Sequence, residues 1–240
     1  LKDAIINPHH YSYVHNPDKV CVNVSVDLLV GVVSAPSHFD QRTKGRRLCQ
    51  RDHGIVCVFV IGSVAGEALQ RRLDEEAHAH GDVVQTTIVD TPRNLSLKSV
   101  ALLKWATANC SHSKFLLKKD DDVGLEPLTI LNLLRNKSAQ YKHFILGNSK
   151  YLVEGPLRQN ISKYYTSYSE YGPEFFPIFA HGPAYGFPIA TADVLYKVSL
   201  RTKLFWLEDV YITGICAHRA NIPVFFESRF EYKHIGFDYV

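Results

Sequence analysis

The sequence has no methionine, no long apolar run and little net charge. Because an initiator methionine is missing, we expect a fragment of a longer protein, with any membrane anchor upstream of Leu1. No apolar run is long enough for a membrane span, and no signal peptide is visible. A net charge of +3 over 240 residues is too mild to indicate nucleic acid or an anionic membrane surface as a partner.

The composition gives no sign that the chain is divided. It contains no linker or low-complexity segment, and 46% of its residues are hydrophobic, which is enough to bury a sizeable core. We therefore predict a single domain over residues 1–240, in which residues 1–25 form an N-terminal extension or stem.

The first half of the chain alternates between β-rich runs and helical patterns. Strands are predicted at residues 26–33, 55–61 and 83–89 and again from residue 115, with helices at residues 67–80 and 94–109. This alternation predicts an α/β fold with a mainly parallel central sheet flanked by helices. The stretch Lys163–Pro188 is rich in Tyr, Phe, Pro and Gly, and we expect irregular structure there, either a substrate surface or a packed aromatic loop.

The fourth predicted strand ends in three carboxylates, Asp120, Asp121 and Asp122. Neighbouring like charges must be solvated, paired or bound to a metal, and carboxylate oxygens suit Mg²⁺ or Mn²⁺. A solvated acidic turn is the simpler interpretation. However, ligands of parallel α/β sheets lie beyond the carboxyl ends of the strands, which is where these residues fall. The position therefore favours a metal-assisted binding site.

The compartment is indicated by sequons and cysteines. Five of the ten asparagines begin an Asn-X-Ser sequon, which predicts a lumenal or secreted glycoprotein. The predicted glycosylation sites are Asn23, Asn94, Asn109, Asn136 and Asn160. The five cysteines lack the spacing of a zinc site and are compatible with one or two disulfides in an oxidising compartment.

Three blocks of residues carry a resemblance to a known family. They are Asn94-Leu95-Ser96-Leu97-Lys98 continuing through Lys104-Trp105 and Cys110 to Lys119-Asp120-Asp121-Asp122-Val123; Phe176-Pro177 with Gly182, Tyr185 and Gly186; and Glu208-Asp209-Val210-Tyr211 with Gly214 and Cys216. Through these blocks the chain resembles the catalytic domain of the β1,3-galactosyltransferase family, which also contains β1,3-N-acetylglucosaminyltransferases. The resemblance extends from about Val26 to Phe226.

The resemblance implies a GT-A type nucleotide-sugar-binding fold and inverting transfer of a hexose from a UDP-sugar to a glycan hydroxyl in β1,3 linkage. Galactose is the expected sugar; UDP-GlcNAc or UDP-GalNAc is the alternative donor. The resemblance also implies Mn²⁺ or Mg²⁺ as cofactor. The expected location is the Golgi lumen, behind an N-terminal signal-anchor of a type II membrane protein that is absent from this sequence, with a secreted soluble form as a variant.

Site residues are carried over by similarity. Asp122 is expected to bind the metal directly, with Asp120 and His234 as further ligands, although a histidine near a terminus is more often a surface residue. Arg42, Arg46, Lys98, Asp120 and Asp121 are expected to contact the donor, while arginines in an early helix are also commonly solvated. Tyr185, Gly182 and His181 are expected at the acceptor.

The reaction needs a carboxylate that removes the proton of the acceptor hydroxyl. Asp209 matches the family's proposed base, and Glu208 is the second candidate. Asp209 also suits the N-cap of a helix expected to run through residues 215–219, and the two roles are compatible.

Three other functional classes remain open at this stage. A catalytically silent, lectin-like relative would keep the fold, a calcium-binding adhesion module would use the acidic triplet structurally, and a glycoside hydrolase would act with two carboxylates and no nucleotide.

Overall fold

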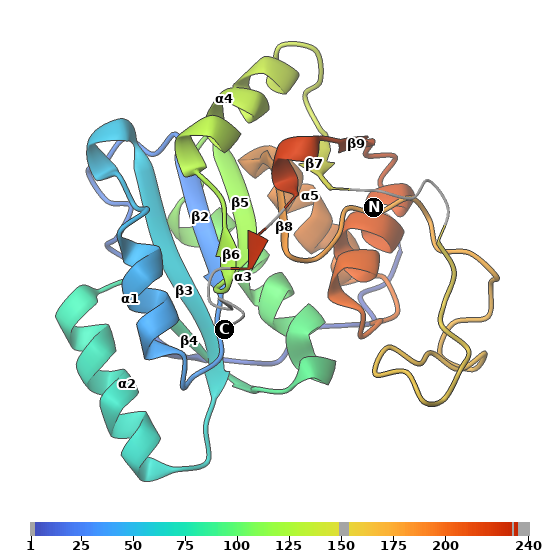
Figure 1. Ribbon diagram of the computed structural model, residues 1–240, viewed down its shortest axis with the longest axis horizontal. Coiled ribbons are helices and arrows are strands. Elements are labelled where there is room, and N and C mark those ends of the chain that lie inside the picture. The colour runs from blue at the N-terminus through green and yellow to red at the C-terminus, as the bar shows by residue number, and fades with distance from the viewer. Residues whose placement is uncertain (1–2, 149–153, 232, 235–240) are drawn as a thin grey trace, which may run out of the picture.

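The computed structural model describes residues 3–148, 154–231 and, for the backbone only, 233–234. Its centre is an eight-stranded sheet with the order β1-β4-β3-β2-β5-β8-β7-β9 (Figure 1). The strands are β1 (Tyr13–His15), β2 (Leu28–Val33), β3 (Ile55–Ser63), β4 (Val83–Val89), β5 (Phe115–Asp120), β7 (Ile145–Gly147), β8 (Ala184–Pro188) and β9 (Val224–Phe226). Strands β4, β3, β2 and β5 are parallel, whereas β8 runs antiparallel to β5.

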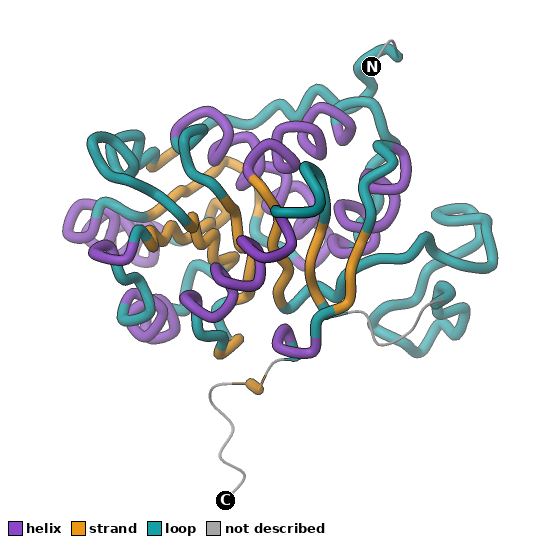
Figure 2. The backbone as a smooth tube through the Cα atoms, turned by 90° about the horizontal axis from the view of Figure 1, so that it is seen from above, coloured by secondary structure: helices purple, strands orange, loops and turns teal. Residues whose placement is uncertain are grey.

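Helices cover both faces of the sheet (Figure 2). They are α1 (Phe39–Arg46), α2 (Glu67–His80), α3 (Leu95–Asn109), α4 (Pro127–Ser138), α5 (Ile189–Ser199), the π-type helical segment η3 (Val210–Cys216) and α6 (Ala217–Arg219). None of the helices in the described part of the chain is both long enough and apolar enough to cross a bilayer.

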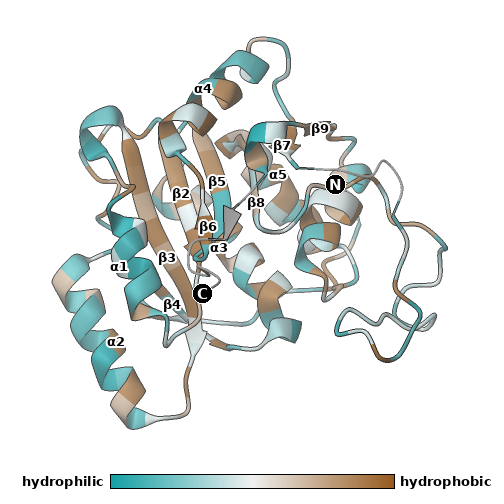
Figure 3. Ribbon diagram, viewed as in Figure 1, coloured by the Kyte–Doolittle hydropathy of each residue, from teal (hydrophilic) through white to brown (hydrophobic). Residues whose placement is uncertain are grey.

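Alternation along the strands assigns each side chain to one of two cores. In β3, Val56 and Val58 pack in the core beneath α3 and α5, while Cys57 and Phe59 pack in the core that α4 covers. Strands buried on both faces are continuously hydrophobic, and Figure 3 shows the central strands as the most apolar part of the molecule. The two cores hold the carboxyl ends of β2 and β5 rigidly side by side, with Val33 opposite Asp120.

The predicted fold class, an α/β fold of GT-A type with a mainly parallel sheet, is confirmed. The expectation of irregular structure over Lys163–Pro188 is wrong at its end, because Ala184–Pro188 is the buried strand β8. Its five residues are apolar or glycine and lack the polar alternation of a half-buried strand, which hides the strand in the sequence. Residues 154–183 form neither helix nor extended strand, and they project to one side of the sheet in Figures 1 and 2.

The described part of the N-terminal extension lies against the domain. Strand β1 adds to the sheet edge by pairing with β4, and a disulfide joins Cys21 to Cys110 at the end of α3. A second disulfide joins Cys49 to Cys57. Cys216 is buried and free. The two bridges confirm the predicted disulfide bonds.

Candidate active site

Two cavities meet at the side chain of Asp209. The first, called the acidic cavity below, has a volume of about 680 Å³, and its lining includes Lys118, Asp120, Asp122, Trp206, Glu208 and Asp209. The second, called the aromatic cavity, has a volume of about 580 Å³, and its lining includes Glu154, Leu157, Phe176, Phe179, His181 and Asp209. Among the acidic side chains that the structure describes, only Asp209 lines both.

The acidic triplet is divided between two cavities: Asp120 ends β5, and Asp121 and Asp122 lie in the turn that follows. Successive strand side chains point to opposite faces, so Lys118 and Asp120 lie on one side and Lys119 on the other. Asp120 and Asp122 line the acidic cavity, whereas Asp121 lines a separate cavity of about 90 Å³. The triplet is therefore a pair of cavity carboxylates separated by one that faces away.

Asp121 is occupied by contacts within the protein. Its Oδ2 accepts a hydrogen bond of 2.6 Å from the hydroxyl of Ser34, which follows β2, and lies 2.9 Å from Nδ1 of His38. Only 8% of its side chain is exposed. Its contact with the donor stays a prediction, and in the structure it joins β5 to the start of α1.

Lys118 is a buried cation at the base of the acidic cavity. Its ammonium donates to Asp120 Oδ1 at 2.8 Å, to the carbonyl oxygen of Gly182 at 2.6 Å and to Glu208 Oε2 at 3.4 Å. The hydroxyl of Tyr185 donates to the other oxygen of Glu208. Burial lowers the pKa of Lys118, but the carboxylates of Asp120 and Glu208 outweigh it and hold that pKa above its usual value. Lys118 therefore stays charged and compensates two carboxylates.

Asp209 is held by two backbone amides. Gly182 N–H donates to its Oδ2 at 2.9 Å, and Val210 N–H donates to its Oδ1 at 2.8 Å. Each oxygen retains a further lone pair. Burial raises the pKa of Asp209 above that of an exposed aspartate, although the two amides oppose the shift. Such a carboxylate is a stronger base than an exposed one, and the two amides fix its orientation.

Glu208 is less available than Asp209. It is buried, and its two oxygens accept from Lys118 and Tyr185. Burial raises its pKa, an effect that the Lys118 ammonium opposes. Glu208 therefore forms the floor of the acidic cavity.

The predicted acceptor residues fall in three different places. His181 lines the aromatic cavity, and its Nε2 lies 2.9 Å from Oε1 of Glu154. Gly182 lines the acidic cavity. Tyr185 is fully buried in β8, where its hydroxyl donates a hydrogen bond to Glu208. The structure thus brings His181 and Gly182 to the cavities beside Asp209 and places Tyr185 beneath them.

Arg42 and Lys98, both predicted to contact the donor, lie outside the two cavities. The guanidinium of Arg42 is fully buried and donates to both carboxylate oxygens of Glu76, at distances of 2.7 to 3.0 Å. The ammonium of Lys98 donates to Asp90 Oδ2 at 2.7 Å and to the carbonyl oxygen of Ser34 at 2.9 Å. In this structure both residues fix the segments around the carboxyl end of β2.

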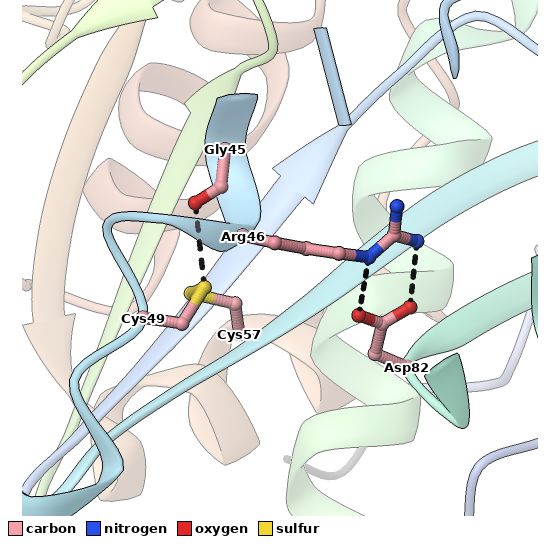
Figure 4. Close-up of a disulfide and its surroundings, with 5 residues drawn as sticks. All are labelled: Gly45, Arg46, Cys49, Cys57 and Asp82. Atoms are coloured by element: carbon pink, nitrogen blue, oxygen red, sulfur yellow. Dashed lines mark hydrogen bonds and ion pairs between the residues drawn. A yellow bond between two sulfur atoms is a disulfide. The ribbon is translucent and has the colours of Figure 1, made fainter. Parts of the chain in front are cut away.

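Arg46 lies beside Asp82, the residue that precedes β4, and near the Cys49–Cys57 disulfide (Figure 4). Its guanidinium donates two hydrogen bonds of 2.8 Å to the carboxylate of Asp82, next to the Cys49–Cys57 disulfide. These residues line a cavity of about 660 Å³ that contains none of the acidic triplet. The guanidinium of Arg46 also lies 2.8 Å from Oε1 of Glu76, the carboxylate that Arg42 binds. The structure therefore brings Arg46 together with Arg42, outside the cavities that the acidic triplet lines.

The metal prediction depends partly on a residue whose side chain is not described. The backbone of His234 pairs with Val123, which follows the triplet, but the side chain of His234 lies outside the described residues. No cluster of three His, Cys, Asp or Glu side chains suited to a metal occurs in the part of the chain that the structure describes. Asp120 and Asp122 nevertheless fit a cation such as Mg²⁺ or Mn²⁺, which commonly takes one or two carboxylates and completes its shell with phosphate oxygens and water.

The five sequons differ in accessibility. Asn23, Asn136 and Asn160 are exposed. The other two asparagines are partly buried, and their side-chain amides donate to backbone carbonyls: Asn94 to Val89 at 2.9 Å and Asn109 to Trp105 at 3.0 Å. The geometry favours the three exposed asparagines as glycosylation sites.

Sequence reasoning missed two residues of the site. Lys118 has a signal in the sequence, because a lysine inside an apolar strand indicates a buried ion pair. Glu154 has no comparable signal, because it stands in a loop that only the fold brings to His181.

Comparison with known proteins gives consistent matches. The galactosyltransferase family model matches residues 40–225. The chain is 28% identical to beta-1,3-galactosyltransferase 1 of Mus musculus, over 99% of the chain and 74% of that protein. It is 30% identical to beta-1,3-galactosyltransferase 5 of Homo sapiens, over 88% of the chain and 69% of that protein. It is 33% identical to the human acetylgalactosaminyl-O-glycosyl-glycoprotein beta-1,3-N-acetylglucosaminyltransferase, over 86% of the chain and 56% of that protein.

Proposed function

The chain belongs to the galactosyltransferase family, and we propose that it is an inverting β1,3-galactosyltransferase that moves galactose from UDP-galactose to a hydroxyl of an acceptor glycan. Membership confirms the predicted resemblance and makes the chain a hexosyltransferase. The β1,3 linkage is supported by the names of its relatives.

One observation carries the proposal: Asp209 lines both cavities. An inverting transfer needs the donor on one side of the base and the acceptor on the other, so that the hydroxyl attacks the face of the anomeric carbon opposite the leaving group. With UDP-galactose in the acidic cavity and the acceptor in the aromatic cavity, Asp209 takes the proton of the hydroxyl as its oxygen bonds to the anomeric carbon. The bond to the diphosphate breaks, and UDP leaves with the electron pair.

The donor side is built to receive a diphosphate with its cation. Asp120 and Asp122 would hold Mn²⁺ or Mg²⁺, which supplies Lewis-acid stabilisation of the charge that develops on UDP. Lys118 fixes the orientation of the Asp120 carboxylate through its hydrogen bond of 2.8 Å. Lys163, on the projecting loop, adds a positive charge to the same cavity and attracts the phosphates.

The location and the domain organisation are parts of the same proposal. The two disulfides suit an oxidising compartment, and we place the domain in the Golgi lumen or in a secreted form, with a signal-anchor upstream. We further propose that residues 1–240 act as one catalytic domain, in which residues 1–25 are an N-terminal extension or stem. The Cys21–Cys110 bridge supports this arrangement because it ties the extension to α3.

UDP-GlcNAc is the second candidate donor. A relative that is 33% identical is named as an N-acetylglucosaminyltransferase, which keeps UDP-GlcNAc as the alternative.

The proposal is tested with the purified domain, a panel of UDP-sugars, and simple β-GlcNAc and β-Gal acceptors, with Mn²⁺ or with a chelator. We expect transfer from UDP-galactose that requires the metal, and a β1,3 product by NMR. If transfer occurs only from UDP-GlcNAc, then UDP-GlcNAc and not UDP-galactose is the donor. Tight UDP binding without transfer to any acceptor would instead indicate a silent, lectin-like relative.

A further inference from the structure

The aromatic cavity contains a polar pair that the proposed reaction does not use. Glu154 and His181 line it with side chains that are 30% and 24% exposed, so both reach the cavity surface. A carboxylate only accepts hydrogen bonds, so Nε2 of His181 is the donor in the 2.9 Å contact with Glu154. In the neutral imidazole, Nδ1 is then left as an acceptor.

The backbone holds both members of this pair in place. The carbonyl oxygen of Glu154 accepts from Phe176 N–H at 2.7 Å, and His181 N–H donates to the carbonyl oxygen of Asn148 at 2.8 Å. The imidazole packs against Phe179, with the ring centres 5.5 Å apart. The pair is therefore preorganised, as a specificity element of a small-molecule site is expected to be.

The acidic side chains that line the aromatic cavity have no lysine or arginine beside them in the described lining. Glu154 and Asp209 are both carboxylates, and no lysine or arginine occurs among its described lining residues. The acidic cavity differs, because Lys118 and Lys163 line it together with its carboxylates. An anionic group that enters the aromatic cavity thus meets two carboxylates and no lysine or arginine from the described lining.

The remaining walls of the aromatic cavity are apolar. Leu157, Phe176, Phe179 and Leu207 contribute to them. Apolar walls with a few fixed polar groups are typical of sites that bind an uncharged polar molecule, since the walls contact its C–H faces and the polar groups fix its orientation.

We propose that the acceptor is a neutral sugar whose hydroxyls hydrogen-bond to Glu154 and His181, and that Glu154 excludes acceptor sugars that bear a sulfate or carboxylate group. The inference rests on the proposed function, because it assigns the aromatic cavity to the acceptor. Sulfated and uronic-acid-containing glycans are therefore poor acceptors, and a neutral galactoside or N-acetylglucosaminide is a good one.

The experiment compares a neutral β-linked N-acetylglucosaminide with its 6-O-sulfated analogue, in the wild type and in Glu154→Gln, Glu154→Lys and Glu174→Gln variants. Two readouts are used: kcat/KM for transfer, and saturation-transfer difference NMR of each sugar on the UDP-loaded protein. Glu174 is the matched control because it is exposed, stands in the same projecting loop and lies outside the lining of the cavity.

We expect kcat/KM of the wild type to favour the neutral sugar at least about ten-fold, since like-charge juxtaposition in a binding site is strongly unfavourable. Glu154→Gln should narrow this ratio by raising use of the sulfated sugar, Glu154→Lys should narrow it further, and Glu174→Gln should leave it unchanged. Equal use of both sugars by the wild type, or a ratio unaffected by Glu154→Gln, would overturn the proposal. Selective sugar binding in the NMR readout without any transfer would support the selectivity and reject the proposed reaction.

Discussion

The buried ammonium of Lys118 donates a 2.6 Å hydrogen bond to the carbonyl oxygen of Gly182. The amide of the same glycine holds the carboxylate of Asp209 at 2.9 Å. Because Lys118 also binds Asp120, one side chain connects a carboxylate of the acidic cavity with the glycine whose amide orients the proposed base. The relative position of donor and base therefore depends on a residue that needs to touch neither sugar.

Replacing Lys118 with methionine should destabilise the fold. The change leaves Glu208 buried without its cation, and breaking a buried pair in this way lowers the free energy of unfolding by about 3–5 kcal/mol. Urea denaturation measures the loss. Lys114→Met is the control, since Lys114 is 63% exposed and its pair with Asp27 lies at the surface, where such pairs contribute about 0.2–1 kcal/mol.

The double variant Lys118→Met/Glu208→Gln separates the ion pair from packing. Removing the buried charge of Glu208 as well should restore part of the stability lost in Lys118→Met. If the stability losses of Lys118→Met and Glu208→Gln simply add in the double variant, then the two side chains do not stabilise each other, which would contradict the assignment of a buried ion pair.

The pH dependence of turnover should show the raised pKa of Asp209. The base works only when ionised, so kcat should fall as the pH falls through a value above the usual aspartate pKa. Stability depends on pH in the opposite direction: the contribution of a group with a raised pKa in the folded state is complete below the unfolded pKa and is lost as the pH rises through the folded one. Measurement of kcat against pH, with UDP affinity recorded over the same range, tests this. A fall of kcat centred at the pKa of an exposed aspartate would contradict the assignment of Asp209 as the base.

The three aspartates of the triplet should not be equivalent. Asp120→Asn and Asp122→Asn should each weaken the metal-dependent binding of UDP, because both side chains line the acidic cavity. Asp121→Asn should instead retain that binding and lower stability, because Asp121 holds Ser34 and His38. Calorimetric titration of UDP with Mn²⁺ and with chelator measures the difference. Equal loss in all three variants would mean that Asp121 also contacts the donor.

The two disulfides should contribute unequally to stability. In the chain-entropy model, the Cys21–Cys110 bridge, which spans 89 residues, contributes about 4–5 kcal/mol, and the Cys49–Cys57 bridge, which spans 8, about 2–3 kcal/mol. Paired Cys→Ser variants compared by thermal unfolding give the two values. A larger loss from opening the shorter loop would show that native packing, and not chain entropy, decides the order.

Much of the sheet was predictable because its strands are buried on both faces and alternate with amphipathic helices. The runs at β2 and β3 are almost continuously apolar, and β4 is rich in the β-branched residues Val, Thr and Ile. The predicted helix at residues 67–80 coincides with α2, which ends at Gly81 in a left-handed conformation. β8 escaped prediction because its residues, Ala-Tyr-Gly-Phe-Pro, include a glycine and a proline and show no polar alternation, so no local pattern marks it as a strand.

The site was predictable only where its residues adjoin in sequence. The acidic triplet and the Glu208-Asp209 pair each form a continuous motif, whereas the Glu154–His181 pair joins residues 27 positions apart. The burial of Arg42 also depends on tertiary context, because its partner Glu76 lies on a different helix. Sequence spacing places Arg42 in a helix but does not show which way its guanidinium points.

The most direct test is the kinetics of Asp209→Asn. The asparagine keeps the size of the side chain and removes its basic oxygen, so kcat should fall about 100-fold to 10,000-fold, the range attributed to general base catalysis, while UDP affinity changes little. Asp193→Asn is the control, since Asp193 pairs only with Lys197 on the surface of α5 among its described contacts. Unchanged UDP binding with turnover lost is the predicted result; full turnover in Asp209→Asn would show that another group takes the proton.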